Sequence, residues 1–344
     1  MHIPDGYLSP QTAGVMYTLS LPFVYRATKR LKFIMSEHLV PRISMFSALS
    51  FVIMMFNVPL PGGTTGHAVG AAIAAIVLGP WAAILAVSMA LIIQALFFGD
   101  GGILALGANI FNMGIAMPLT SYLLYTYISK YKESISWKVI SGFIAGYIAI
   151  NVSALLTGVE LGIQPLLFRD AAGHALYFPY PLKIAIPAMA IGHLTVAGFA
   201  EGILTAVTLR WIIRTQPDLL QIKNSKVKIQ NKNIKINNKS NSRIMGLSNN
   251  GFIGLLLLIV LTPLGLLAPG TAWGEWGREE LLNLGLGFIP EGFDRWSTIW
   301  HAPIPDYALK GLPPAIVYIA SALFGVLILF LVFYLPYWIL RRRK

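Results

Sequence analysis

Long apolar stretches, separated by short polar or Gly/Pro-rich breaks, dominate this chain. Several approach the roughly 20 residues that an α-helix needs to cross the hydrocarbon core of a bilayer. The stretches fall near residues 11–26, 43–60, 67–79, 81–98, 103–127, 138–158, 182–213, 252–268 and 314–340. We therefore expect an all-α integral membrane protein, a polytopic helical bundle of about nine transmembrane helices, seven plus two. Leu78-Gly79-Pro80-Trp81 interrupts one apolar run without any charge, which predicts either a hairpin or a kink there.

Composition supports the membrane interpretation and restricts the chemistry. Of 344 residues, 56% are hydrophobic and 12% charged, and the mean hydropathy is +0.67. The absence of cysteine excludes disulfides, thiolate zinc sites and iron–sulfur clusters, so any metal must be held by nitrogen or oxygen. The net charge of +12 comes without basic–aromatic recognition patterns, so it indicates membrane orientation and not a nucleic-acid partner.

Basic residues gather beside the predicted spans, and such residues concentrate on the cytoplasmic side of a membrane. Four groups follow the first, fifth, seventh and last spans. After the first span come Arg26, Lys29, Arg30, Lys32 and Arg42, and after the fifth Lys130, Lys132 and Lys138. After the seventh come Arg210, Arg214, Lys223, Lys226, Lys228, Lys232, Lys235 and Lys239, and after the last Arg341, Arg342, Arg343 and Lys344. An odd number of spans satisfies all four assignments. The prediction is then an external N-terminus, a cytoplasmic C-terminus, and external turns at 61–67 and 99–102.

A change in composition divides the chain. From about Gln216 to Asn250 the sequence becomes rich in Lys, Asn, Ser and Ile, without an apolar period. We predict a membrane domain at 1–213, a basic cytoplasmic linker at 214–250, and a two-span domain at 251–344 with an external loop at 269–312. A plain cytoplasmic loop is an equally good interpretation of the linker. The external loop is net acidic, which would attract cations, although a solvated loop without that role has the same composition.

The first two residues offer unusual chemistry. Met1-His2-Ile3-Pro4 is not the start of a signal peptide, and methionine is normally trimmed only ahead of a small residue, so Met1 should keep its free amine. That amine, the amide nitrogen of His2 and its imidazole Nδ1 can close a five- and a six-membered chelate ring on one ion. They fill three corners of a square plane, a geometry that suits Ni(II) or Cu(II).

The fourth corner requires a nitrogen from elsewhere. Of the six histidines, His38 falls in a predicted cytoplasmic loop, on the wrong face. His67 is preferred because it opens a span directly after an external Pro/Gly-rich turn. The alternative is that His67 only caps or packs a helix start, since Gly66-x-x-x-Gly70 is also a helix-packing pattern.

The remaining histidines have structural explanations too. His174 lies in an external loop and suits a surface position, whereas His301 sits in an aromatic belt beside Trp300. His193 and Glu201 lie eight residues apart inside a span, and that spacing predicts one helical face and either a polar pair or a subunit contact. The candidate polar residues for orienting the metal ligands are Thr64, Thr65, Gln94, Asn109 and Asn112.

Several motifs of residues 1–213 resemble the substrate-specific component of nickel/cobalt energy-coupling factor transporters. They are Met-His-Ile-Pro-Asp-Gly-Tyr-Leu-Ser-Pro at 1–10, Val-Pro-Leu-Pro-Gly-Gly-Thr-Thr-Gly-His-Ala-Val-Gly at 58–70, Leu-Gly-Pro-Trp at 78–81 and Phe-Gly-Asp-Gly-Gly-Ile-Leu-Ala-Leu-Gly-Ala-Asn at 98–109. The resemblance implies that Met1, His2 and His67 bind the metal. It also implies a transmembrane coupling protein and cytoplasmic ATPase subunits as partners.

The second unit resembles the small two-span companion subunit of these transporters, here fused to the first. The resemblance rests on Trp-Gly-Glu-Trp-Gly at 273–277, Ile-Pro-Glu-Gly-Phe at 289–293, where Phe293 replaces the usual leucine, and Pro-Ile-Pro-Asp-Tyr at 303–307. No phosphate-binding Gly-x-x-x-x-Gly-Lys-Ser/Thr loop occurs in the chain. ATP must therefore be used by other subunits.

Together these features predict external capture of Ni(II) or Co(II), as substrate, for ATP-driven uptake across a prokaryotic plasma membrane. No organic cofactor, catalytic residue or enzyme activity is expected, because no paired catalytic carboxylates or nucleophile–base motif stands out. Two alternatives are a membrane metal sensor that does not transport, and an importer of vitamin-type small molecules in which the histidines are structural.

Overall fold

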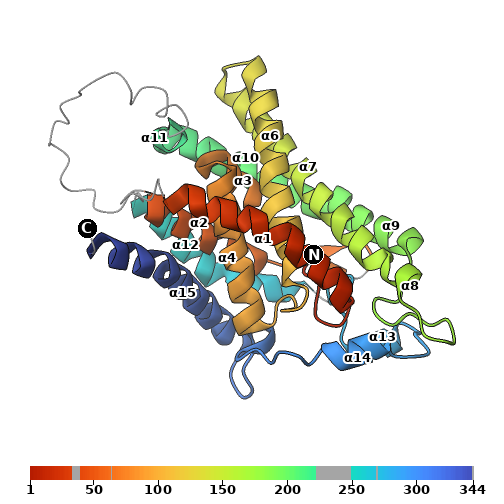
Figure 1. Cartoon of the computed structure of the whole chain (residues 1–344). Helices are drawn as coiled ribbons and strands as arrows, with labels where there is room; N and C mark the ends of the chain where they lie inside the picture. The colour runs from red at the N-terminus through yellow and green to blue at the C-terminus, as the bar shows by residue number, and fades with distance from the viewer. Residues whose placement is uncertain (33–38, 63, 222–248, 269, 343–344) are drawn as a thin grey trace, which may run out of the picture.

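The computed structural model describes residues 1–32, 39–62, 64–221, 249–268 and 270–342 (Figure 1). The first part contains α1 (Pro10–Lys32), α2 (Leu39–Met54), β1 (Val58–Leu60), β2 (Thr64–Gly66), α3 (Ala71–Leu78), α4 (Pro80–Ile93), η1 (Gln94–Phe98), α5 (Leu106–Asn109), η2 (Ile110–Ala116), α6 (Met117–Ile128), η3 (Ser129–Tyr131), α7 (Ile135–Gly162), α8 (Gln164–Leu167), α9 (Leu182–Gly192), η4 (His193–Ala197), α10 (Gly198–Thr215) and α11 (Asp218–Gln221). The second contains α12 (Asn249–Leu261), η5 (Thr262–Leu267), α13 (Arg278–Asn283), α14 (Glu291–Trp296), η6 (Pro305–Tyr307) and α15 (Pro314–Arg342). His38 and the linker lysines from Lys223 to Lys239 lie outside the described residues.

The helical membrane class predicted from the apolar stretches is confirmed. Among the described residues, four helices are long and apolar enough to cross a membrane, at Pro80–Phe98, Ile135–Leu167, Leu182–Thr215 and Pro314–Ile339. Leu39–Met54 and Gly251–Leu267 are shorter apolar helices. A total of nine spans therefore stays a prediction.

The uncharged interruption at 78–81 is a break between two helices. Gly79 has a φ of 83°, in the region open to glycine, and Pro80 begins α4, where its missing N–H costs nothing. α3 is consequently only 8 residues long. The apolar run at 67–79 thus contains a loop and a short helix, and the loop carries His67.

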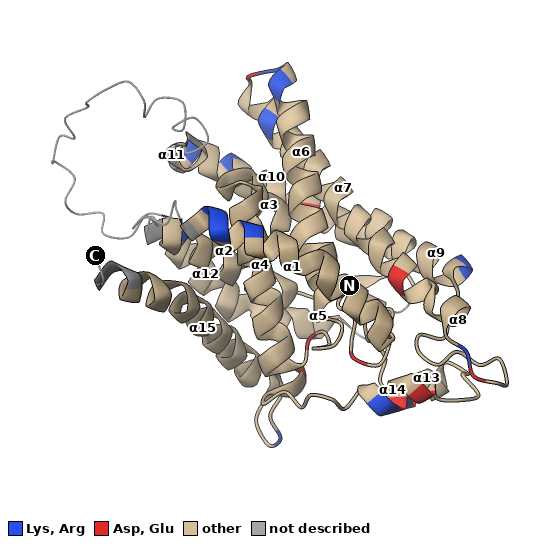
Figure 2. Ribbon diagram, viewed as in Figure 1, with Lys and Arg blue, Asp and Glu red and all other residues tan. Residues whose placement is uncertain are grey.

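Charged residues divide between the two ends of the bundle. Figure 2 shows blue Lys and Arg segments near α2, on α10, and at the tip between α6 and α7. Red Asp and Glu segments lie mainly at the opposite end, on α13 and α14 and in neighbouring loops, where a few basic residues also occur. This division follows the pattern from which the cytoplasmic and external faces were predicted.

Hydrogen bonds connect the first nine residues to the 99–109 region and to α8, where Gln164 accepts from the backbone N–H of Ser9 at 3.1 Å. The side chain of Asn109 binds both polar groups of the Ile3 backbone: it accepts from the N–H at 2.8 Å and donates to the carbonyl at 3.1 Å. Both oxygens of the Asp5 carboxylate accept from the backbone N–H groups of Ile103 and Leu104, at 2.9 and 2.7 Å. A short antiparallel hairpin, β1–β2, stands next to this segment and leads into His67.

The C-terminal unit packs against the first unit on both sides of this region. α15 lies along α2, where an atom added at Gly325 would meet the ring of Phe51. Thr65 of β2 forms a parallel bridge with Ala272, and Trp273 meets the ring of Phe178 edge-on. Residues 270–307 therefore form part of the wall around the N-terminal segment.

Candidate metal site

The three residues predicted as metal ligands gather in one buried region. Met1, His2 and His67 are only 5%, 3% and 5% exposed. The imidazole rings of His2 and His67 stack, with their centroids 5.1 Å apart. Because one ring comes from the chain start and the other follows β2, the fold itself brings these two imidazoles together.

The amine of Met1 contacts the C-terminal unit. Its nitrogen lies 3.0 Å from Oε1 of Glu275, forming an ion pair that joins the two ends of the sequence. Glu275 also borders the cavity that His2 and His67 line. One of the nitrogens that the chelate requires is therefore held by a carboxylate in this arrangement.

A carboxylate also holds His2. Its Nδ1 lies 2.9 Å from Oδ1 of Asp100, while its Nε2 is buried without a hydrogen-bond partner. The other Asp100 oxygen accepts from the hydroxyl of Tyr307 at 2.6 Å and from Nε2 of Gln94 at 3.1 Å. Burial alone would raise the pKa of Asp100, but the neighbouring His2 and the hydrogen bonds from His2 and Tyr307 hold that pKa below its usual range.

His67 is prepared to act as a neutral ligand. Its Nδ1 donates to the carbonyl oxygen of Ala68 at 3.0 Å, an assignment that leaves Nε2 with a free lone pair. Burial, and next the nearby terminal amine, lower the pKa of His67 well below its usual value. The imidazole is thus uncharged at neutral pH, the form that a metal ion requires.

These side chains line a cavity of about 330 Å³, large enough for a hydrated ion. Its polar wall consists of His2, Asn57, Thr65, His67, Asp100, Thr271, Glu275, Asp306, Tyr307 and Tyr318. Within the described part of the chain, no three His, Asp or Glu side chains converge as a metal cluster. A metal bound here would therefore rely on main-chain nitrogen at Met1 and His2 in addition to the imidazoles.

His193 and Glu201 do not form the polar pair that was one of their two interpretations, and the other, a subunit contact, stays a prediction. Nδ1 of His193 donates to the Met189 carbonyl at 2.7 Å, whereas Glu201 accepts from the backbone of residues 69, 70 and 72. The physical reason is η4, a π-helical turn at His193–Ala197. Such a turn shifts the helical phase, so an eight-residue spacing no longer selects one face.

The other two histidines lie away from the cavity. His174 is exposed, hydrogen-bonds Asp170 at 3.2 Å, and stacks on Phe288. His301 is also exposed, next to Trp300, which donates its indole N–H to the Leu96 carbonyl. Both surface interpretations agree with the structure.

The polar residues suggested as orienting groups separate into two sets. Gln94 bonds Asp100, Asn109 holds Ile3, and Thr65 lines the cavity. Thr64 donates to the carbonyl of Thr271, which connects the hairpin to the C-terminal unit. Asn112 belongs elsewhere, because it donates to Glu160 and Thr157 inside the bundle.

The sequence did not reveal the two carboxylates that contact candidate ligands, Asp100 and Glu275, or Tyr307, which donates to Asp100. Asp100 lies in the predicted 99–102 turn and in the motif at 98–109, and Glu275 lies in the acidic loop and in the motif at 273–277. Tyr307 likewise belongs to the motif at 303–307, but none of these signals indicated which residue each side chain would contact. Their contacts with Met1 and Asp100 join residues more than 200 positions apart.

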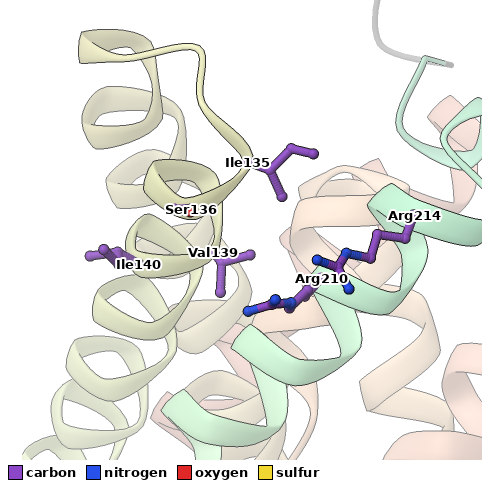
Figure 3. Close-up of a pocket in the computed structure, with 6 residues that line it drawn as sticks. All are labelled: Ile135, Ser136, Val139, Ile140, Arg210 and Arg214. Carbon is purple, nitrogen blue, oxygen red and sulfur yellow. The ribbon is translucent and has the colours of Figure 1, made fainter.

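A second cavity, of about 410 Å³, lies between α7 and α10. Figure 3 shows Arg210 and Arg214 on α10 near Ile135 and Val139 of α7. Its lining contains no imidazole or carboxylate, so it lacks ligands for a divalent cation. The cavity containing the histidines is the better candidate.

Comparison with known proteins shows the family to which the chain belongs. Residues 2–219 match the family model described as the cobalt uptake substrate-specific transmembrane region, CbiM, and residues 250–342 match the PDGLE domain. The chain belongs to the CbiM family. Family membership places the chain among metal transporters and not among enzymes.

Two relatives that align with almost the whole chain are named as fused nickel transport proteins. The fused nickel transport protein NikMN of Rhodobacter capsulatus is 44% identical over 95% of this chain and 94% of that protein. The probable fused nickel transport protein LarMN of Lactiplantibacillus plantarum is 42% identical over 96% of each. A cobalt transport protein CbiM of Geobacter sulfurreducens is 29% identical over 64% of this chain and 61% of that protein.

Solved structures of transition metal transporters share the CbiM fold. One matches with a TM-score of 0.61 at 48% identity, and covers 66% of this chain and 100% of that protein. A truncated transporter matches with a TM-score of 0.59 at 51% identity, and covers 62% of this chain and 99% of that protein. The likeness therefore extends over about two thirds of this chain.

Proposed function

We propose that this chain captures Ni(II), or Co(II), at the external face of the membrane in a square plane of four nitrogens. Three are the Met1 amine, the His2 amide and His2 Nδ1, and the fourth is an imidazole nitrogen of His67. The stacking of His2 on His67 at 5.1 Å, inside a cavity next to the terminal amine, is the observation that supports this proposal. Of the two candidate ions, planar nitrogen coordination favours nickel over cobalt.

Binding would exchange existing contacts for bonds to the ion. The Met1 amine must leave Glu275, and Nδ1 of His2 must leave Asp100, before both can bind the metal. The amine and the His2 amide each lose a proton in the process, and the proton on Nδ1 of His2 moves to Nε2, which leaves the Nδ1 lone pair for the metal. The two carboxylates stay next to the cavity, where their negative charges attract the incoming dication and offset its charge.

Transport would require subunits that this chain does not contain. Its sequence has no phosphate-binding loop, so we assign ATP hydrolysis to cytoplasmic ATPases and the transmission of movement to a transmembrane coupling protein. In this proposal the N-terminus faces the outside of a prokaryotic plasma membrane. The basic linker at 214–250 connects the metal-binding unit to the companion unit on the inside.

The test compares His67→Ala with His174→Ala in the purified full-length protein. His67→Ala removes the fourth nitrogen, whereas His174 is exposed and outside the cavity. Calorimetric titration with nickel should show at least a hundredfold loss of affinity for the first variant and no change for the second. Unaltered nickel binding in His67→Ala would rule out the site.

A membrane sensor is distinguished by metal accumulation. Cells that express the chain with its coupling and ATPase partners should accumulate nickel, and should lose this ability with His67→Ala. A sensor would bind nickel without any accumulation, and a vitamin importer would bind neither nickel nor cobalt in the titration.

A further inference from the structure

Glu201 on α10 is a fully buried carboxylate that the proposed coordination does not use. Its exposed fraction is 0%. Oε2 accepts from the backbone N–H groups of Val69 and Gly70 at 2.8 and 2.9 Å, and Oε1 accepts from Ala72 at 3.2 Å. A buried carboxylate is costly unless hydrogen bonds compensate it, and here three backbone donors do so.

These hydrogen bonds replace a missing helix cap. α3 begins after Gly70, which has a φ of 73° and no side chain with which to cap the helix. The first N–H groups of any helix need acceptors and carry partial positive charge. Glu201 supplies the acceptors from a residue more than 120 positions along the chain.

One peptide group connects Glu201 to His67. The N–H of Val69 donates to Glu201. The carbonyl of Ala68, which belongs to the same peptide unit, accepts from Nδ1 of His67 at 3.0 Å. A carboxylate, a peptide and an imidazole thus form a continuous series of hydrogen bonds. Ser50 holds the next peptide by donating to the Val69 carbonyl at 2.7 Å.

We propose that Glu201 is a positioning residue for His67 and acts through the Ala68–Val69 peptide. Metal-bound histidines usually donate their second nitrogen to a carboxylate or a carbonyl, which fixes the tautomer and orientation of the ring. Here the carbonyl is the direct partner, and Glu201 polarises it and fixes it in place from the far side of the peptide. Nε2 of His67 then points its lone pair toward the metal. This inference rests on the proposed role of His67.

The test compares Glu201→Gln with Glu160→Gln. Both carboxylates are buried in the membrane unit, but Glu160 bonds Asn112 and not the His67 loop. In Glu201→Gln an amide N–H₂ faces backbone N–H donors, so at least one acceptor is lost. We expect nickel affinity to fall about 10- to 100-fold in Glu201→Gln and to stay within about threefold of the parent in Glu160→Gln.

A second readout separates positioning from general destabilisation. Nitrogen-15 NMR of histidine-labelled, metal-free protein, with the His67 signal assigned by its loss in His67→Ala, reports which ring nitrogen carries the proton. We expect a predominantly Nδ1-protonated His67 in the parent and in Glu160→Gln, and a mixture of tautomers in Glu201→Gln. If Glu201→Gln does not fold, Glu201→Asp keeps a carboxylate that is one methylene shorter, and we expect an intermediate affinity and tautomer ratio.

The outcomes distinguish this inference from the function on which it rests. If His67→Ala loses nickel while Glu201→Gln binds nickel like the parent with an unchanged tautomer, positioning by Glu201 is refuted and the metal site stands. Equal losses in Glu201→Gln and Glu160→Gln would also overturn it, since they would show a nonspecific effect. If Glu201→Asp is the variant tested, parent-like affinity and tautomer ratio refute it. If His67→Ala keeps nickel, the proposed function itself fails.

Discussion

Extending the N-terminus by two residues tests whether Met1 is a ligand. Two residues are needed because a single one would place histidine third, where the amine, two amides and imidazole complete a square plane without His67. With two, the Met1 nitrogen becomes an ordinary amide and His2 becomes the fourth residue. The original three-nitrogen chelate can then no longer form.

The structure gives the size of the effect. Met1 is 5% exposed, and its amine lies 3.0 Å from Glu275. Two added residues reach about 7 Å, so the new amine cannot occupy the old position. Structural zinc sites with four ligands bind with about 10–16 kcal/mol, or about 3 kcal/mol per ligand. On that scale, losing one nitrogen should weaken nickel binding by at least about a hundredfold.

The assay is calorimetric titration of the purified full-length protein with nickel, after intact-mass measurement has verified the N-terminus. The same two residues added after Lys344 provide the control and should leave the affinity unchanged. If the N-terminally extended chain binds nickel within about threefold of the parent, the terminal amine is not a ligand.

Three further predictions follow from the site. Nickel affinity should fall as the pH is lowered, by at least about one decade per pH unit, because the Met1 amine and the His2 amide must each release a proton when the ion binds. His67, whose pKa burial lowers, should add nothing to this dependence between pH 6 and 8, and a pH-independent titration would contradict the chelate. Gly102→Ala places a Cβ within 2.4 Å of the Asp5 nitrogen, so it should lower the free energy of unfolding by about 1–3 kcal/mol and weaken nickel binding. Gly14→Ala, which has open space around it, should change neither quantity, as thermal unfolding and nickel titration will show. Tyr307→Phe removes a hydrogen bond to Asp100 that contributes about 1.5–3 kcal/mol, so protease should cut the 270–312 segment faster in this variant than in Tyr334→Phe. Equal cleavage rates would show that this contact does not fasten the 270–312 segment to the first unit.

The sequence predicted the class of protein because apolar length is a local property. The runs at 81–98, 182–213 and 314–340 became helices that are long enough to span a membrane. The predicted bounds and faces of the helices were less accurate where the backbone departs from a regular α-helix. Gly79 ended α3 after 8 residues, and the π-helical turn at His193 rotated Glu201 away from the face expected for it.

The partners of the ligands were not predictable, because they are long-range contacts between segments without pattern. No spacing rule relates Met1 to Glu275 or Glu201 to Val69, and each pair forms only when distant segments of the chain pack together. Burial then selects the partner, since an isolated carboxylate inside the bundle must find donors. The sequence showed that Glu201 is an unusual residue for a membrane span but not which backbone it would hold.

The geometry around the ion is the most direct test of the central claim. X-ray absorption at the nickel edge, measured on the nickel-loaded full-length protein, reports the number, type and arrangement of its ligands. Four nitrogens in a plane, reduced to three in His67→Ala, is the predicted result. A six-coordinate spectrum with oxygen ligands, as expected if Asp100 and Glu275 bound the ion directly, would contradict the proposed site.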